Sequence, residues 1–195
     1  MALELESRKY KFHEYYTAFY KGFRTIKFMR RAKKKGQLSD DFIERIMLAV
    51  TQVNGCAVCS YAHTKFALEQ GMSNDEIQKI LSGDTEDIPQ EQSVGVFFAQ
   101  HYADTRGKPS MDSWQRVIDE YGEETALGIL GATRMIMIGN VVGIPMSSFS
   151  SRLKKKPVKN SNVFYELAMP LSTILFVPVA FFHSLFANIF KVAII

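Results

Sequence analysis

Apolar residues recur at steps of three and four positions along most of the chain, which is the spacing of one face of a helix. In the first such stretch, about residues 7 to 35, aromatic side chains keep this spacing between lysines and arginines: Phe12, Tyr15, Tyr16, Phe19, Tyr20 and Phe23. We predict an amphipathic helix that ends at Gly36. Such an aromatic stripe is typical of a core-facing surface, and the alternative is a helix that lies on an anionic membrane.

Turn residues divide the next positions into further helices. Ser39, followed by two aspartates, is a suitable N-cap for a helix that ends at Asn54-Gly55. The next helix runs from about Cys56 to Gln70, and a capping box at Ser73 opens a short helix that ends near Gly83. Helical spacing also covers three later stretches: residues 90–105, 111–121 and 123–150. No stretch alternates as a strand does, so we predict an all-α fold.

The stretch at 123–150 should be central in the domain, because Arg134 is the only charged residue between Leu127 and Pro145. Gly139 and Gly143 lie one turn apart and would let another backbone approach closely, within the subunit or across a subunit contact. Arg134 itself is either the partner of a buried carboxylate or a contact for the carboxylate of a substrate.

A second apolar stretch follows a basic linker near the end of the sequence. The 24 residues from Leu167 to Phe190 contain no Asp, Glu, Lys or Arg, which is long enough to span a bilayer. Four residues argue against a simple span, because they would kink the helix or need polar partners in lipid: Pro170, Pro178, His183 and Asn188. The tail therefore either associates with a membrane or packs on the domain or a neighbouring subunit.

Composition and charge narrow the class of protein. The 195 residues, 47% hydrophobic and 23% charged, are typical of a globular domain with an appendage. The net charge of +4 is concentrated in basic runs at 30–35 and 152–159, which are either solvated surface or face an anionic membrane. We expect no nucleic-acid partner. The first eight residues contain no secretory signal peptide, so we expect a cytoplasmic protein, with the second basic run able to attach it to the cytoplasmic face of a membrane.

The candidate chemistry lies between Glu44 and His63. The only two cysteines, Cys56 and Cys59, form a Cys-x-x-Cys motif, which in a reducing compartment is catalytic or metal-binding more often than structural. On a helix, positions 56, 59 and 63 share one face, so both sulfurs and the imidazole lie together. Cys56 is near the helix start, where unpaired backbone N–H groups stabilise a thiolate. His63, one turn after Cys59, is placed to take a proton from that thiol.

Glu44 comes from the preceding helix. The Asn54-Gly55 turn can fold that helix back, so that the Glu44 carboxylate orients His63 or relays protons through it. A different interpretation also fits the spacing, because two cysteines and a histidine can be three ligands of a zinc ion.

The complete pattern, Glu-x(11)-Cys-x-x-Cys-x(3)-His, resembles the alkylhydroperoxidase D-like branch of the carboxymuconolactone decarboxylase family. The following Thr-Lys-Phe-Ala-Leu-Glu-Gln-Gly-Met-Ser is also similar to that family, and the resemblance covers about residues 38 to 150. It implies an all-helical domain that assembles into homotrimers or homohexamers. It also implies that Cys59 is the thiol activated by His63 and Glu44 and that Cys56 is its disulfide partner. One departure is Val58, where the classical peroxidase has a histidine, so that member's activity level and reductant do not carry over.

We therefore predict an oxidoreductase that needs no cofactor or metal. Its Cys-x-x-Cys dithiol would act as a thiol-dependent peroxidase or disulfide reductase, reducing a hydroperoxide or exchanging with a dithiol or partner redox protein. The alternatives are a lactone decarboxylase of the same superfamily, a zinc-binding module, and a membrane-tethered thiol adaptor. The expected organisation is a basic aromatic helix at 1–37, the redox domain at 38–152, a basic linker at 153–162 and the hydrophobic tail at 163–195.

Overall fold

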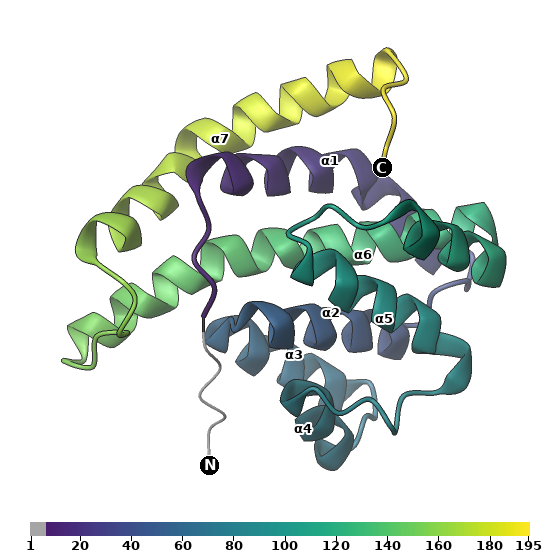
Figure 1. Ribbon diagram of the computed structural model, residues 1–195, viewed down its shortest axis with the longest axis horizontal. Coiled ribbons are helices and arrows are strands. Elements are labelled where there is room, and N and C mark those ends of the chain that lie inside the picture. Colours follow the sequence, from purple (N-terminus) through teal and green to yellow (C-terminus); the bar gives the residue numbers. More distant parts are fainter. Residues whose placement is uncertain (1–6) are drawn as a thin grey trace.

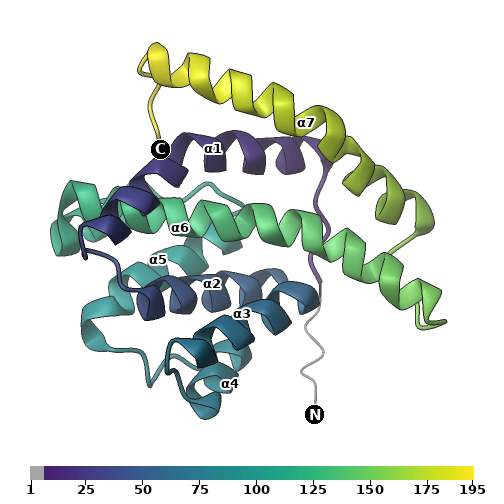
Figure 2. The same cartoon turned by 180° about the vertical axis from the view of Figure 1, so that it is seen from behind.

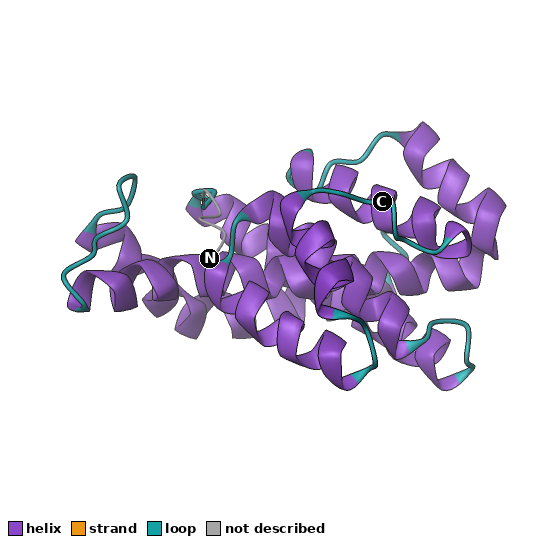
Figure 3. Ribbon diagram, turned by 90° about the horizontal axis from the view of Figure 1, so that it is seen from below, coloured by secondary structure: helices purple, strands orange, loops and turns teal. Residues whose placement is uncertain are grey.

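The helices begin and end at the turn residues that the sequence indicates. The structure is a computed structural model that describes residues 7–195, and this part of the chain contains helices and no strand (Figure 3). The all-α prediction is confirmed. In chain order the helices are α1 (Phe12–Lys34), α2 (Asp40–Asn54), α3 (Ala57–Glu69), α4 (Asn74–Ser82), α5 (Gln90–Asp104), α6 (Met111–Leu153) and α7 (Val163–Ile189). The expectation that there is no signal peptide rests on the first eight residues. Residues 1–6 of that stretch lie outside the described residues.

Local capping explains several of these boundaries. The Ser39 hydroxyl accepts a hydrogen bond from the Phe42 N–H at the start of α2, and the Ser73 hydroxyl accepts one from the Glu76 N–H at the start of α4. At Gly122 inside α6 the backbone turns to φ +75° and ψ 158°, which breaks the helical path. The long helix is therefore two helical segments, and they correspond to the stretches predicted at 111–121 and 123–150.

The apolar part of α6 lies at the centre of the molecule. Figures 1 and 2 show α1 along one side of it and α2 and α5 along the other, with α3 and α4 beyond α2. Both α6 and α7 are long and apolar enough to cross a membrane, but most of the apolar window of α6 is buried within the protein. The length and apolarity of α6 are thus those of a core helix.

The aromatic stripe of α1 is covered by protein on two sides. Tyr15 and Phe19 are buried, and α1 packs on α6 with one face and on α7 with another (Figure 1). Polar groups of α7 meet this stripe: the Tyr15 hydroxyl lies 2.8 Å from Thr173 Oγ1, and the Tyr16 hydroxyl lies 2.8 Å from His183 Nδ1. The core interpretation of the stripe therefore agrees with the structure.

An ion pair fixes the start of α7 to the end of α6. The Arg152 guanidinium donates to both carboxylate oxygens of Glu166, at 2.6 and 2.8 Å, and the Glu166 side chain is fully covered. These hydrogen bonds from Arg152 hold the pKa of Glu166 below its usual range, against the opposing effect of burial. The pair is the principal polar anchor of the tail near the linker.

This anchor should make the tail sensitive to acid. The pKa of a glutamate in the unfolded chain is about 4.3, and a carboxylate whose pKa is lower in the folded protein stabilises the fold at pH values above 4.3. This stabilisation is lost as the pH falls through the pKa of the folded protein. At pH 7 we expect Glu166→Gln to lower the thermal midpoint by roughly 5 °C, and this difference should shrink toward zero below pH 4. Thermal unfolding followed by circular dichroism from pH 7 to pH 3 measures it. Glu123→Gln, at an exposed position, is the matched control and should leave the midpoint unchanged.

Candidate redox site

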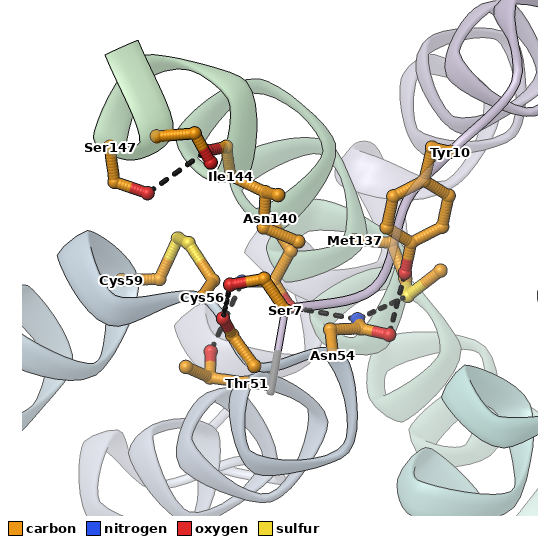
Figure 4. The surroundings of a disulfide bond; sticks show 12 residues. Ser7, Tyr10, Thr51, Asn54, Cys56, Cys59, Met137, Asn140, Ile144 and Ser147 are labelled. Atoms are coloured by element: carbon orange, nitrogen blue, oxygen red, sulfur yellow. Dashed lines mark hydrogen bonds between the residues drawn. A yellow bond between two sulfur atoms is a disulfide. The ribbon is translucent and has the colours of Figure 1, made fainter. Parts of the chain in front are cut away.

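Cys56 and Cys59 are joined in a disulfide at the start of α3 (Figure 4). Cys56 is the N-cap residue of the helix, Cys59 lies in its first turn, and their Cα atoms are 5.3 Å apart. Cys56 is fully buried, whereas Cys59 keeps 8% of its surface exposed. Cys59 is therefore the sulfur that a molecule arriving from solvent can reach more readily.

A network of buried polar side chains holds the turn that precedes the disulfide. Gly55 ends α2 with φ +68°, and its carbonyl accepts a hydrogen bond of 2.7 Å from the Ser7 hydroxyl. Asn54 donates to Asn140 Oδ1 at 2.8 Å, and Asn140 donates to Thr51 Oγ1 at 3.2 Å (Figure 4). These bonds join the end of α2 to the centre of α6 and so fix the position of Cys56.

Sequence reasoning missed the residues of this network. Tyr10 belongs to it as well, because its hydroxyl donates to Asn54 Oδ1 at 2.6 Å. One signal was present: Asn140 is a polar residue in a mostly apolar helical stretch, three positions before Gly143. A buried amide needs hydrogen-bond partners, so its position indicated a polar contact with another element.

Gly143 forms the wall of α6 against which the disulfide packs. A Cβ added to this residue would lie 2.8 Å from Cys56 Sγ, 2.8 Å from Val58 Cγ1 and 3.0 Å from Cys59 Sγ. The close approach at Gly143 therefore occurs within the subunit, and the atoms that approach are side-chain atoms and not the backbone that the glycines predicted. At Gly139, one turn earlier, the nearest such atom is 3.6 Å away, which is an ordinary contact.

Glu44 and His63 form a second pair, across the α2–α3 turn. Glu44 Oε2 lies 2.8 Å from His63 Nδ1, and the two side chains are only 14% and 17% exposed. When Nδ1 carries the proton and donates it to the carboxylate, Nε2 is left as a free base. The Phe66 ring stands edge-on to the imidazole, with 5.8 Å between the ring centroids. The contact between Glu44 and His63 is present, and their catalytic roles stay a prediction.

The surface of α3 around the disulfide is apolar. Val58, between the two cysteines, is 46% exposed, and Tyr61 is 78% exposed.

Within residues 7–195 the structure contains no group of three or more His, Cys, Asp or Glu side chains arranged to hold a metal ion. The zinc interpretation of Cys56, Cys59 and His63 would require the disulfide to be reduced and stays an alternative.

Comparison with known proteins gives one match. The model of the carboxymuconolactone decarboxylase family matches residues 17–88, which cover most of α1 and all of α2, α3 and α4. The match contains Glu44, both cysteines and His63, and it begins and ends earlier than the range of about 38 to 150 expected from the resemblance. No curated protein and no solved structure matches the chain.

The contact at Gly143 leads to a prediction with a control on the same helix. We expect Gly143→Ala to reduce the free energy of unfolding by about 1–3 kcal/mol, because the added methyl group must displace the disulfide or the α3 backbone. Gly139→Ala should change it by no more than about 1 kcal/mol, and in the stabilising direction, because alanine favours the helix. Urea unfolding of the two oxidised proteins measures both changes. Equal effects of the two substitutions would mean that α3 does not pack on α6 as described.

Proposed function

From the match of residues 17–88 to the carboxymuconolactone decarboxylase family, we propose that the chain is a dithiol oxidoreductase of that family. Cys56 and Cys59 reduce a hydroperoxide or exchange electrons with a partner redox protein. The observation that carries the proposal is the disulfide at the start of α3 on the same helix as His63, whose imidazole is hydrogen-bonded to Glu44.

The reaction begins at Cys59, the more accessible sulfur. His63 accepts the thiol proton, and the Cys59 thiolate attacks the distal oxygen of the hydroperoxide. An S–O bond forms, the O–O bond breaks, and the leaving alkoxide takes a proton to become an alcohol. Two electrons pass from sulfur to the peroxide, and Cys59 becomes a sulfenic acid.

Cys56 completes the cycle from its buried position. Its sulfur attacks the Cys59 sulfenic acid, the S–S bond forms, and hydroxide leaves as water. The buried site at Cys56, against Gly143, keeps this sulfur away from other oxidants until the condensation. An external dithiol then reduces the disulfide through a mixed disulfide at Cys59.

Glu44 acts on this chemistry through His63. Its carboxylate fixes the imidazole in the tautomer that has Nε2 as the base and stabilises the imidazolium that forms when His63 takes the thiol proton. Cys56 at the N-cap also places the dithiol near unpaired backbone N–H groups, which favour the thiolate form.

The exposed apolar surface of α3 supports exchange with another protein. Val58, Tyr61 and Phe66 are between 46% and 78% exposed on the helix that carries the disulfide. Apolar and aromatic side chains of this kind are enriched at protein contact surfaces. The reductant is a candidate for this surface, and so is a second copy in the homotrimer or homohexamer that the family resemblance implies.

Single-turnover oxidation tests the dithiol cycle. With cumene hydroperoxide added to the fully reduced protein, we expect loss of both thiols in the wild-type protein and no rapid loss in Cys59→Ser. Cys56→Ser should stop at a sulfenic acid that dimedone traps. His63→Gln should slow thiol loss by about a hundredfold, because the general base is removed. Free-thiol titration and mass spectrometry measure these outcomes.

The matched control is the Glu69→Gln protein, which lacks an exposed carboxylate of the same helix. Its thiols should be oxidised at the wild-type rate. Thiol loss that is equally fast in wild-type and His63→Gln proteins would rule out the role of the Glu44–His63 pair. Unchanged peroxide reduction in Cys59→Ser would rule out the peroxidase cycle itself.

We also propose that α7 attaches the protein to the cytoplasmic face of a membrane. The polar residues that argued against a simple span lie toward α1: His183 meets Tyr16, and Asn188 Oδ1 accepts from Arg24 Nε at 3.4 Å. The opposite face of α7 exposes an apolar row, here called the α7 outer face: Phe164, Leu167, Leu171, Ile174, Leu175, Phe182, Leu185, Phe186 and Ile189.

The orientation that fits these contacts is a helix parallel to the membrane surface. An amphipathic helix buries its apolar face at the boundary between head groups and acyl chains. The linker before α7 carries Lys154, Lys155, Lys156 and Lys159, which attract anionic lipid head groups. With α1 on one side of α7 and lipid on the other, a crossing of the bilayer is not required.

Vesicle flotation tests the attachment. We expect the wild-type protein to float with phosphatidylcholine vesicles that contain phosphatidylserine, and less so at high salt, which screens the lysines. Leu175→Asp together with Phe182→Asp should abolish flotation, because two charges enter the α7 outer face. Phe97→Asp, at an exposed aromatic residue of α5, is the control and should still float. Flotation by both variants would exclude the α7 outer face as the contact.

A further inference from the structure

A cavity of about 210 Å³ lies between α1, the end of α5 and α6. Met137 and Val141 of α6 and Ala18 of α1 give it an apolar lining. On α6 its residues are Arg134, Met137 and Val141, which follow the i, i+3, i+7 spacing of one helix face. Gly143, which packs on the disulfide, is not on that face. The cavity therefore does not contain the disulfide, although Tyr10 and Met137 of its lining also contact Asn54 in the polar network beside the redox site.

Positive charge prevails around this cavity. Four cationic side chains line it: Lys21, Arg106, Lys108 and Arg134. The one carboxylate among its lining residues, Glu14, pairs with Arg106 at 3.0 Å. Within the described part of the chain, Lys21, Lys108 and Arg134 have no carboxylate partner.

Arg134 is the most deeply buried of these cations, at 1% exposure. Its Nε donates to the Tyr102 hydroxyl at 2.9 Å, and its Nη2 donates to the Ile194 carbonyl at 2.8 Å. Its Nη1 has no hydrogen-bond partner among residues 7–195. The sequence analysis offered a buried ion pair with a carboxylate as one role of Arg134, and residues 7–195 contain no such pair. A buried guanidinium with an unused donor is costly unless an anion meets it.

Lys21 stands near this guanidinium on the facing helix. Its ammonium donates to the Gly107 carbonyl at 2.6 Å. Burial, and then the positive charges of Arg134 and Lys108, lower the pKa of Lys21 to about 8. The three cations therefore repel one another in a partly desolvated site, and a bound anion would relieve that repulsion.

We propose that this cavity binds a small organic carboxylate with an apolar body. The carboxylate accepts a hydrogen bond from the Lys21 ammonium and, after a shift of the side chains that cover it in this structure, a second one from Arg134 Nη1. Lys108 adds positive charge at the rim, and the body contacts Met137 and Val141. The size agrees, because a cavity of about 150 Å³ holds benzene and the volume here leaves room for an additional charged group. This site does not depend on the redox function of the cysteines.

Isothermal titration calorimetry with benzoate and benzamide tests the proposal on the full chain at pH 7. The two probes have nearly the same shape, and only benzoate is charged. We expect benzoate to bind, and benzamide to bind roughly tenfold more weakly or worse, because its neutral carbonyl accepts hydrogen bonds from the cations but forms no ion pair with them. Lys21→Met keeps most of the side-chain volume and should weaken benzoate binding by a similar factor. Lys27→Met, at an exposed position of the same helix outside the cavity, should bind as the wild-type protein does.

A second variant separates the cavity from general attraction by positive charge. Ala18→Leu leaves every cation in place and fills part of the cavity, so it should also weaken benzoate binding roughly tenfold or more. The test remains decisive if Lys21→Met fails to fold, which circular dichroism detects. Wild-type affinity in Ala18→Leu would overturn the proposal, as would equal binding of the two probes or no binding of benzoate.

The pH dependence of binding gives an independent readout. Charged and titratable groups that face Lys21 come from α6 (Arg134), from α5 and its following loop (Tyr102, Arg106 and Lys108), and from α1 (Tyr10, His13 and Glu14). Burial raises the pKa of Tyr10 and of Tyr102, so both stay neutral up to pH 9. Benzoate affinity should fall as the pH rises through about 8, where the Lys21 ammonium loses its proton. In Lys21→Met this fall should vanish, and its persistence there would contradict the role of Lys21.

Discussion

The rest of the structure depends on one constraint, which is the close approach of other elements to the apolar part of α6. Two glycines set that distance on different faces of the helix. A Cβ at Gly131 would lie 2.8 Å from the Thr25 carbonyl oxygen of α1, and a Cβ at Gly143 would lie 2.8 Å from Cys56 Sγ. The first contact lets α1 lie against α6, and the second positions the disulfide. One helix therefore supports both the fold and the candidate redox site.

Close packing of this kind buries polar groups, and their partners restrict how the helices align. Thr51, Asn54 and Asn140 are fully buried, and each takes part in hydrogen bonds between α2 and α6. A buried amide without a partner costs about 1–3 kcal/mol, so a shifted alignment of α2 on α6 is disfavoured. Because α2 ends at Gly55, this alignment also sets where α3 begins and which sulfur is covered.

The buried charges of the chain are of two kinds. Glu166 is paired with Arg152, and Arg45 joins Asp41 and Glu76, so these charges hold helices together. Arg134 is equally buried but meets a phenol and a backbone carbonyl in place of a carboxylate. A charge of the first kind is explained by the fold alone. A charge of the second kind does not by itself indicate a ligand, because Arg24 is also buried and donates to the carbonyl oxygens of Val192 and Ala193. Arg134 differs from Arg24 because its Nη1 has no hydrogen-bond partner among residues 7–195.

The sequence by itself determined the helices and the motif, because both depend on contacts within a few residues. Ser39 and Ser73 cap helices through the next turn of the chain, and Gly122 marks the break in α6 by its own backbone conformation. The spacing of Cys56 and Cys59 likewise places both sulfurs on one helix face. The fold class and the family resemblance followed from these local patterns.

Only the tertiary structure decided what meets across helices. The hydrogen bond between Glu44 and His63 depends on the angle at which α2 and α3 cross after Gly55. The deeper burial of Cys56 depends on α6, which is more than eighty residues away in the chain. Packing between distant helices also decided that the polar residues of α7 face α1. It likewise left Arg134 without a carboxylate beside it among the described residues. Periodicity along one helix says which residues share a face, but the partner of that face is set by packing among all of them.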